Sequence, residues 1–161
     1  MKDFVWKSGQ KKITCFNDII KILEFVSKDV NHKIIIGSDS VKLGKYWIFT
    51  KAIAIINPAD GFYDRKYFYL REKLNDASYI DLSKRLLKET SDSIEIAINI
   101  RDIISNANIE IHADVNSESQ HNSNKYKNMI AGYISGCGFS VKVKPESFVA
   151  SSIADNHTRK N

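Results

Sequence analysis

The sequence predicts a mixed α/β fold, in which a five-stranded sheet of three antiparallel strands followed by parallel strands is flanked by helices. Strand-type runs rich in β-branched and aromatic residues come first, and only short turns separate them. Later strand-type runs alternate with segments of helical period. Helices between strands imply crossover connections, so the later strands are expected to pair in parallel.

Length and composition are those of one globular domain, which we place at residues 1–161, with residues 1–30 as an N-terminal extension that carries a short helix. Hydrophobic residues make up 43% and charged residues 27%, a balance that disordered chains do not have. The formal net charge of +5 leans toward polyanionic partners without identifying one.

Cysteine usage and hydropathy exclude several classes of protein. The two cysteines, Cys15 and Cys137, share no short metal spacing, which disfavours a zinc site or a disulfide framework. No run approaches the roughly 18 apolar residues of a membrane span, and the first residues lack the apolar centre of a signal peptide. We therefore expect a cytoplasmic protein with no membrane partner.

In the first half of the chain, a helix is predicted over residues 17–30, where apolar side chains recur at near-helical spacing after an Asn-Asp start. The first strand is expected at residues 33–38. Gly44 marks a hairpin turn, and residues 45–57 and 62–73 predict the second and third strands, joined by another turn.

In the second half, the predicted elements are a long helix, a strand, a helix and a strand, at residues 78–105, 108–115, 123–135 and 138–144. A final helix is expected from Glu146 to about Arg159. Pro145 stands just before it, in the place of a helix starter.

Glu89 lies on the apolar stripe of the long helix, three residues after Leu86 and seven before Ile96, so it is expected to face the sheet. Glu95 is expected to face water, because its neighbours at helical offsets are polar: Ser91, Asp92, Asn99 and Asp102. A buried carboxylate is costly unless it is paired or binds a cation. Glu89 is therefore a candidate metal ligand, with pairing to a basic residue or a place at the edge of the stripe as alternatives.

Two aspartates follow strand-type runs. Asp39 comes after the isoleucines of "KIIIGSDS", and Asp114 appears as "IEIHADV" gives out. Ligands collect at the carboxyl ends of parallel strands, so both carboxylates are expected at one edge of the sheet. The alternative for each is an aspartate that only begins a turn.

The final helix supplies a fourth acid. Asp155 shares a helix face with Phe148 and Ser152, and His157 follows closely. Asp155 is a candidate ligand or a solvated residue near the chain end, and His157 is a proton-transfer group or an ordinary exposed histidine. Carboxylates that converge repel each other unless they share cations. Mg²⁺ or Mn²⁺ suits such oxygen ligands, and two such ions about 4 Å apart support phosphodiester hydrolysis.

This order of elements, with acids after the first and fourth strands and in the long and final helices, resembles the ribonuclease H-like nuclease superfamily. More narrowly, the phrases "IGSDS", "YLREK", "IHADVN" and "GFSVKVKPESFVASSIADNHTR" resemble the YkuK family of predicted ribonuclease H-like proteins. The resemblance extends over about residues 17–159. In one place the chain departs from it, because Val41 stands where the family phrase usually continues Asp-Ser-Gln.

The resemblance implies a single ribonuclease H-like domain with four metal-binding carboxylates. Asp39 would bridge two divalent ions, and Asp114 would help to hold one of them. Glu89 would hold a metal or orient water, and Asp155 would complete the other metal site.

Basic and amide side chains suggest where a substrate would lie. Lys51, Arg71 and Lys73, on the second and third strands, could contact phosphate or could be ordinary solvent-facing residues. Asn116 lies in a polar stretch beside Asp114 and could border a substrate groove.

The sequence therefore predicts a metal-dependent nuclease that acts on RNA, DNA or a hybrid by a two-metal carboxylate mechanism. One alternative is a noncatalytic nucleic-acid-binding module on the same fold. Another is a small-molecule phosphohydrolase.

Overall fold

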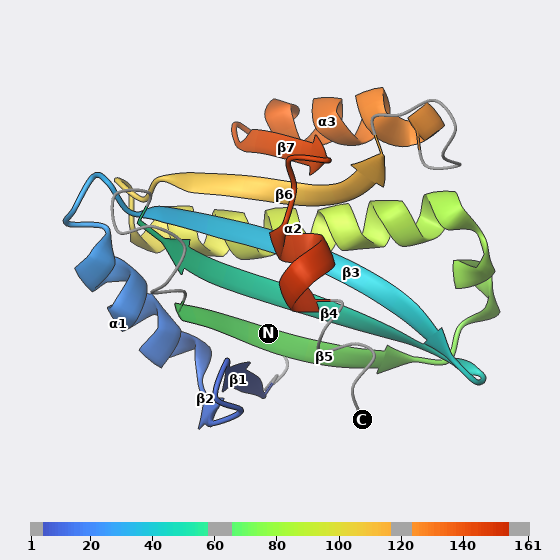
Figure 1. Ribbon diagram of the computed structural model, residues 1–161, viewed down its shortest axis with the longest axis horizontal. Helices are drawn as coiled ribbons and strands as arrows, with labels where there is room; N and C mark the ends of the chain where they lie inside the picture. The colour runs from blue at the N-terminus through green and yellow to red at the C-terminus, as the bar shows by residue number, and fades with distance from the viewer. Residues whose placement is uncertain (1–4, 58–65, 117–123, 155–161) are drawn as a thin grey trace.

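The computed structural model describes residues 5–57, 66–116 and 124–154. Its strands are β1 (Trp6–Ser8), β2 (Ile13–Thr14), β3 (Lys33–Leu43), β4 (Tyr46–Ile56), β5 (Lys66–Leu74), β6 (Ile109–Asn116) and β7 (Ser140–Lys144). They form one mixed sheet of seven strands in the order β2-β1-β5-β4-β3-β6-β7 (Figure 1).

The helical elements are α1 (Phe16–Val26), the short η2 (Ala77–Ile80), α2 (Leu82–Ile103), the short η3 (Asn124–Tyr126), α3 (Lys127–Gly136) and the π-helical η4 (Val149–Ala154). The long α2 lies behind the sheet in Figure 1, and η4, in red, lies in front of β3 and β4. Within the described residues, no helix has the length and apolar character that a membrane span requires.

The predicted pairing is confirmed, but the predicted number of strands is wrong. β3, β4 and β5 pair antiparallel, and β6 and β7 continue the sheet in parallel. Two further strands, β1 and β2, pair antiparallel beyond β5. They are three and two residues long, too short to show the alternating pattern by which a strand is predicted.

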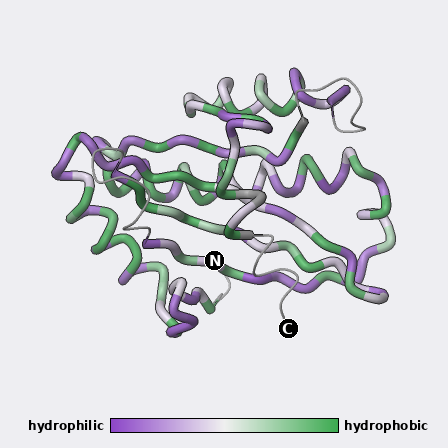
Figure 2. Tube along the Cα trace, in the orientation of Figure 1, coloured by the Kyte–Doolittle hydropathy of each residue, from purple (hydrophilic) through white to green (hydrophobic). Residues whose placement is uncertain are grey.

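The predicted end of the first strand at Ser38 is also wrong. β3 continues to Leu43 because it stays paired with β4 up to the hairpin, where Gly44 takes a positive φ of 60°. Asp39 therefore lies inside a strand, opposite Thr50. Figure 2 follows this change of character along β3, from the hydrophobic isoleucines to the more hydrophilic residues after Gly37.

The helices differ from their predicted bounds at several places, and α1 ends at Val26 instead of residue 30. The long helix is divided at Asp81, whose carboxylate accepts a hydrogen bond from the Ser83 N–H and caps α2. The final helix does not begin at Glu146, because the Glu146 N–H donates to the Val143 carbonyl in a turn. In the described residues this helix begins at Val149. The predicted continuation to Arg159 lies outside the described residues.

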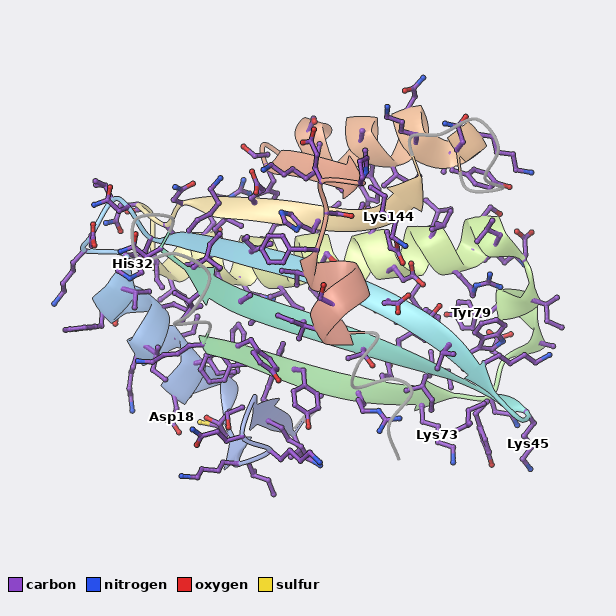
Figure 3. The ribbon with its side chains drawn as sticks, viewed as in Figure 1. Asp18, His32, Lys45, Lys73, Tyr79 and Lys144 are labelled. Atoms are coloured by element: carbon purple, nitrogen blue, oxygen red, sulfur yellow. The ribbon has the colours of Figure 1, made fainter. Side chains whose placement is uncertain are left out.

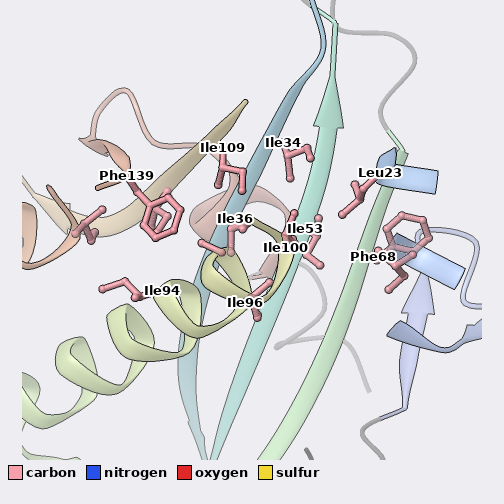
Figure 4. Close-up of a cluster of buried hydrophobic side chains, with 14 of the residues drawn as sticks. Leu23, Ile34, Ile36, Ile53, Phe68, Ile94, Ile96, Ile100, Ile109 and Phe139 are labelled. Atoms are coloured by element: carbon pink, nitrogen blue, oxygen red, sulfur yellow. The ribbon is translucent and has the colours of Figure 1, made fainter. Parts of the chain in front are cut away.

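Alternate residues of the isoleucine run face two different layers. Ile34 and Ile36 join the main core, to which α1, α2 and α3 all contribute (Figure 4). Ile35 faces the other way and packs with Val149 and Ile153 of η4. The sheet is therefore covered by three helices on one face, and η4 packs on the other.

A substitution in α2 should separate the buried face of this helix from its exposed face. Ile100 is 0% exposed in the main core and Ile103, on the same helix, is 56% exposed. Ile100→Ala should lower the free energy of unfolding by about 2–5 kcal/mol, since it leaves a cavity. Ile103→Ala should change it by no more than about 0.5 kcal/mol. Urea unfolding followed by circular dichroism measures both, and equal losses would contradict the packing described.

Candidate functional site

Asp39 and Asp114 lie on adjacent strands at matching positions. The parallel ladder between β3 and β6 ends at the pair Gly37–His112. Asp39 and Asp114 each stand two residues beyond that pair. The structure therefore brings both aspartates to the place where the parallel pairing stops, although Asp39 is not at the end of its own strand.

Both aspartates point to the face on which η4 packs. Ala113 and Val115 are buried in the main core, so Asp114 between them points away from it. Ser40 reaches toward α2, so its neighbour Asp39 points to the opposite face.

Glu89 enters the site from α2, on the other side of the sheet, and its predicted orientation toward the sheet is confirmed. Its side chain is 8% exposed, and one carboxylate oxygen accepts a hydrogen bond from the Ser40 hydroxyl at 2.5 Å. Burial raises the pKa of Glu89 well above its usual value, and the negative charges of Asp39 and Asp114 raise it further. The Ser40 hydrogen bond and the charge of Arg85 act in the opposite direction.

Ser40 is a site residue that the sequence analysis missed. Its position next to Asp39 placed it on the opposite face of the strand, which is the face that α2 covers. The alternation of side chains along a strand predicts that Ser40 faces α2, but only once β3 is known to continue past Ser38.

A lysine stands beside one of the candidate ligands. The ammonium group of Lys144, the last residue of β7, forms an ion pair with the Asp114 carboxylate. Figure 3 shows Lys144 beside the carboxyl-terminal part of β6. In this conformation Asp114 therefore already has a cationic partner.

The donor chemistry of these side chains suits a hard divalent cation, because Asp39, Glu89 and Asp114 offer carboxylate oxygens. Across residues 5–57, 66–116 and 124–154, however, no three His, Cys, Asp or Glu side chains gather closely enough to hold a metal ion. The other predicted residues, Asp155 and His157, lie outside the described residues. The pair of Mg²⁺ or Mn²⁺ ions thus stays a prediction.

A buried polar chain next to Asp114 was not foreseen. The Nδ1 atom of His112 accepts a hydrogen bond from the Phe148 N–H at 3.1 Å, so Nε2 carries the proton and donates to Glu110, also at 3.1 Å. The ammonium of Lys33 completes the chain, 3.2 Å from the Glu110 carboxylate. The residues just before η4 are therefore attached to β6 two residues before Asp114.

The electrostatics of this chain are consistent with its hydrogen bonds. Burial lowers the pKa of His112, although Glu110 opposes the shift, and the neutral ring is the form that can accept from Phe148. Burial would raise the pKa of Glu110, but His112 and Lys33 outweigh it and the pKa lies below its usual value. The alternation of Glu110 and His112 with isoleucines was the signal that they share a face with Asp114.

Lys51 belongs to a buried ion-pair group on the α2 face of the sheet. Its ammonium lies 3.0 Å from the Asp92 carboxylate and 3.5 Å from that of Glu72, and Lys88 lies 3.0 Å from both acids. The water-facing side of the helix that the polar neighbours of Glu95 predicted does not include Asp92, which is buried against these two lysines, whereas Glu95 is exposed as expected.

The other residues predicted to contact substrate lie at different places. Arg71 pairs with Thr50, which pairs with Asp39, so the three stand in one row across the sheet. Lys73 is two residues further along the same face of β5, with its ammonium 3.8 Å from the centre of the Tyr46 ring. Figure 3 shows Lys73 near the hairpin end of the sheet.

Lys51 points to the opposite face from Asp39, since it pairs with Ser38 and contacts α2. Asn116 is the last residue of β6 and pairs with Lys144 in the ladder. Arg71 and Lys73 are thus the predicted cationic residues that share a face with the two aspartates.

Comparison with known proteins gives one finding. The family model described as "Ribonuclease H-like" matches residues 17–159, which is most of the chain. Neither the curated proteins nor the solved structures contain a match. The narrower resemblance to the YkuK family stays a prediction.

The raised pKa of Glu89 should appear in the pH dependence of stability in metal-free protein. The folded chain holds this proton more tightly than the unfolded chain, so the free energy of unfolding should fall as pH rises above the ordinary value of 4.5. Glu89→Gln cannot ionise and should remove this decline. Urea unfolding between about pH 5 and pH 8 with a chelator present measures it.

The matched control is Glu95→Gln, an exposed residue on the same helix, which should leave the slope unchanged. A slope for Glu89→Gln that parallels the wild type would show that this carboxyl is ionised throughout.

Proposed function

Because the chain belongs to the ribonuclease H-like family, we propose that it is a metal-dependent nuclease that hydrolyses phosphodiester bonds in nucleic acid. The observation that supports this most is the effect of two aspartates, from two strands, on a buried glutamate of a third element. Asp39 of β3 and Asp114 of β6 share one face, and both raise the pKa of Glu89 of α2. Such perturbed groups cluster at functional sites.

The roles of the acids follow from their positions. Asp39 and Asp114 would hold Mg²⁺ or Mn²⁺, with Asp155 as a further ligand by family resemblance, and two ions are expected. When bound, these ions supply an activated water and stabilise the leaving oxygen. Glu89, fixed by the Ser40 hydroxyl, would hold a metal or orient water.

The substrate would lie across the face that carries Asp39. Arg71 is two strands away from Asp39 in the same row, about 10 Å at the usual strand spacing. Arg71 and Lys73 would contact phosphates beside the bond to be cleaved, and Asn116 would border the same groove. His157 remains a candidate for proton transfer to the leaving group.

A noncatalytic nucleic-acid-binding module on the same fold is the second candidate. It is favoured by the finding that the described part of the chain holds no ready-made group of three metal-ligating side chains. This module would bind nucleic acid without turnover, and its binding would be indifferent to substitution of Asp39 or Asp114.

The first prediction from this proposal concerns Asp39. Purified protein should cleave single-stranded RNA, DNA or a hybrid when Mg²⁺ or Mn²⁺ is added. Asp39→Asn should lower the rate by about 100-fold or more, the range for removing one group that stabilises transition-state charge. A gel assay with end-labelled substrate measures this, with folding checked by circular dichroism.

Asp102→Asn is the isosteric control, since Asp102 is exposed on α2, and it should keep the wild-type rate. An Asp39→Asn protein that cleaves at the wild-type rate would rule out the proposed mechanism. Binding without any turnover, unchanged in Asp39→Asn, would favour the noncatalytic module.

A second prediction concerns the basic residues of β5. Arg71→Gln combined with Lys73→Gln should weaken binding of a fluorescent oligonucleotide and reduce the slope of log affinity against log salt by about one per lost phosphate contact. Fluorescence anisotropy over a salt series measures both. Lys66→Gln is the control, because Lys66 is exposed on the same strand but points to the opposite face of the sheet. Equal losses in the control would assign the effect to overall charge.

A further inference from the structure

The ion pair between Lys144 and Asp114 joins the edge strand of the sheet to the proposed site. On β7, Val141 and Val143 pack against the main core, so Lys142 and Lys144 point to the other face, where Asp114 also points. The Lys144 side chain is 32% exposed.

The register of β6 and β7 changes where this pair forms. His112 pairs with Lys142, but the next pair is Asn116 with Lys144, so β6 uses four residues where β7 uses two. Asp114 lies inside the irregular stretch. Irregularities of this kind re-aim a side chain beside a site.

The charges around Asp114 show what the lysine does there. Asp39 and Asp114 place two carboxylates on the face of the sheet on which η4 packs, and the Lys144 ammonium contacts the second of them. The Lys144 ammonium offsets one of these two charges. It does so at the carboxylate that a metal ion would need, and a divalent cation at Asp114 would repel the ammonium beside it.

We infer that Lys144 is a built-in cation that competes with a divalent metal ion for the Asp114 carboxylate. The inference rests on the proposed metal-dependent function and adds to it a residue that sets metal affinity. Lys144 is a positioning residue: it holds Asp114 in place in the metal-free protein and moves into solvent when the ion binds. The protein therefore binds metal more weakly than its carboxylates alone would.

The test is Mn²⁺ binding to the full, metal-free chain, measured by titration calorimetry at low ionic strength. Lys144→Gln should bind Mn²⁺ roughly five-fold more tightly than the wild type, the size expected for removing one partly exposed ion pair. Lys144→Arg keeps the charge and should stay near the wild type. Lys142→Gln is the matched control, since Lys142 lies on the same face of β7, 3.9 Å from Glu110, and should leave Mn²⁺ binding unchanged.

A second measurement reports on Lys144 in the wild-type protein itself. Lysines dimethylated with ¹³C keep their charge, and the NMR signal of Lys144 is identified by its absence from Lys144→Arg. Titration with Mg²⁺ should shift this signal as the ion pair opens. The signal of Lys142 should stay in place.

The outcomes separate this inference from the proposed function. Unchanged or weaker Mn²⁺ binding by Lys144→Gln, or a Lys144 signal that ignores Mg²⁺, would overturn the competition and leave a metal site in place. A lower unfolding midpoint in chelator with unchanged Mn²⁺ affinity would mean that the lysine only stabilises the fold, which also overturns it. Failure of both the wild type and Lys144→Gln to bind Mn²⁺ would overturn the inference and the proposed function together.

Discussion

The candidate site depends on one constraint, the parallel register of β3 against β6. Because Gly37 and His112 form the last pair of that ladder, the next outward-facing residues on the two strands are both aspartates. A shift of this register by one residue would point the side chain of one of these aspartates into the main core. The same alternation sends Ser40 to the opposite face, where it meets Glu89. This register thus positions Asp39 and Asp114 on one face of the sheet. It places the Ser40 hydroxyl, which fixes Glu89, on the other face.

The ion pairs on the two faces of the sheet are arranged differently. On the helix-covered face, Lys51 and Lys88 meet Asp92 and Glu72 in a compact group in which two positive charges balance two negative ones. Ion pairs of this kind need all their members, since removing one leaves an unpaired buried charge. On the other face, the charges form separate pairs, Lys33 with Glu110 and the more exposed Asp114 with Lys144.

Sequence patterns predicted the central pairing of the sheet and the orientation of Glu89, because both follow from residue periods that are uninterrupted over many residues. They failed for β1 and β2, which are too short to show a period. They also placed Asp39 at the end of its strand, whereas β3 loses its pairing with β6 there but stays paired with β4. Asp92 and Lys144 were out of reach for a different reason. Lys51 lies 41 residues from Asp92 and Asp114 lies 30 residues from Lys144 along the chain, and only the folded sheet brings each of these pairs together. Lys88, four residues before Asp92, is the partner that helical spacing places near it.

The edges of the sheet also affect how the protein behaves in concentrated solution. Unpaired strand edges are templates on which other chains can add strands, and proteins restrain this with short or charged edge strands. Here β2 offers only two residues at one edge, and β7 at the other is five residues long with two lysines. The lysine that contacts Asp114 therefore also belongs to an edge that discourages aggregation, so a gain in metal affinity from its removal would come with a loss of solubility.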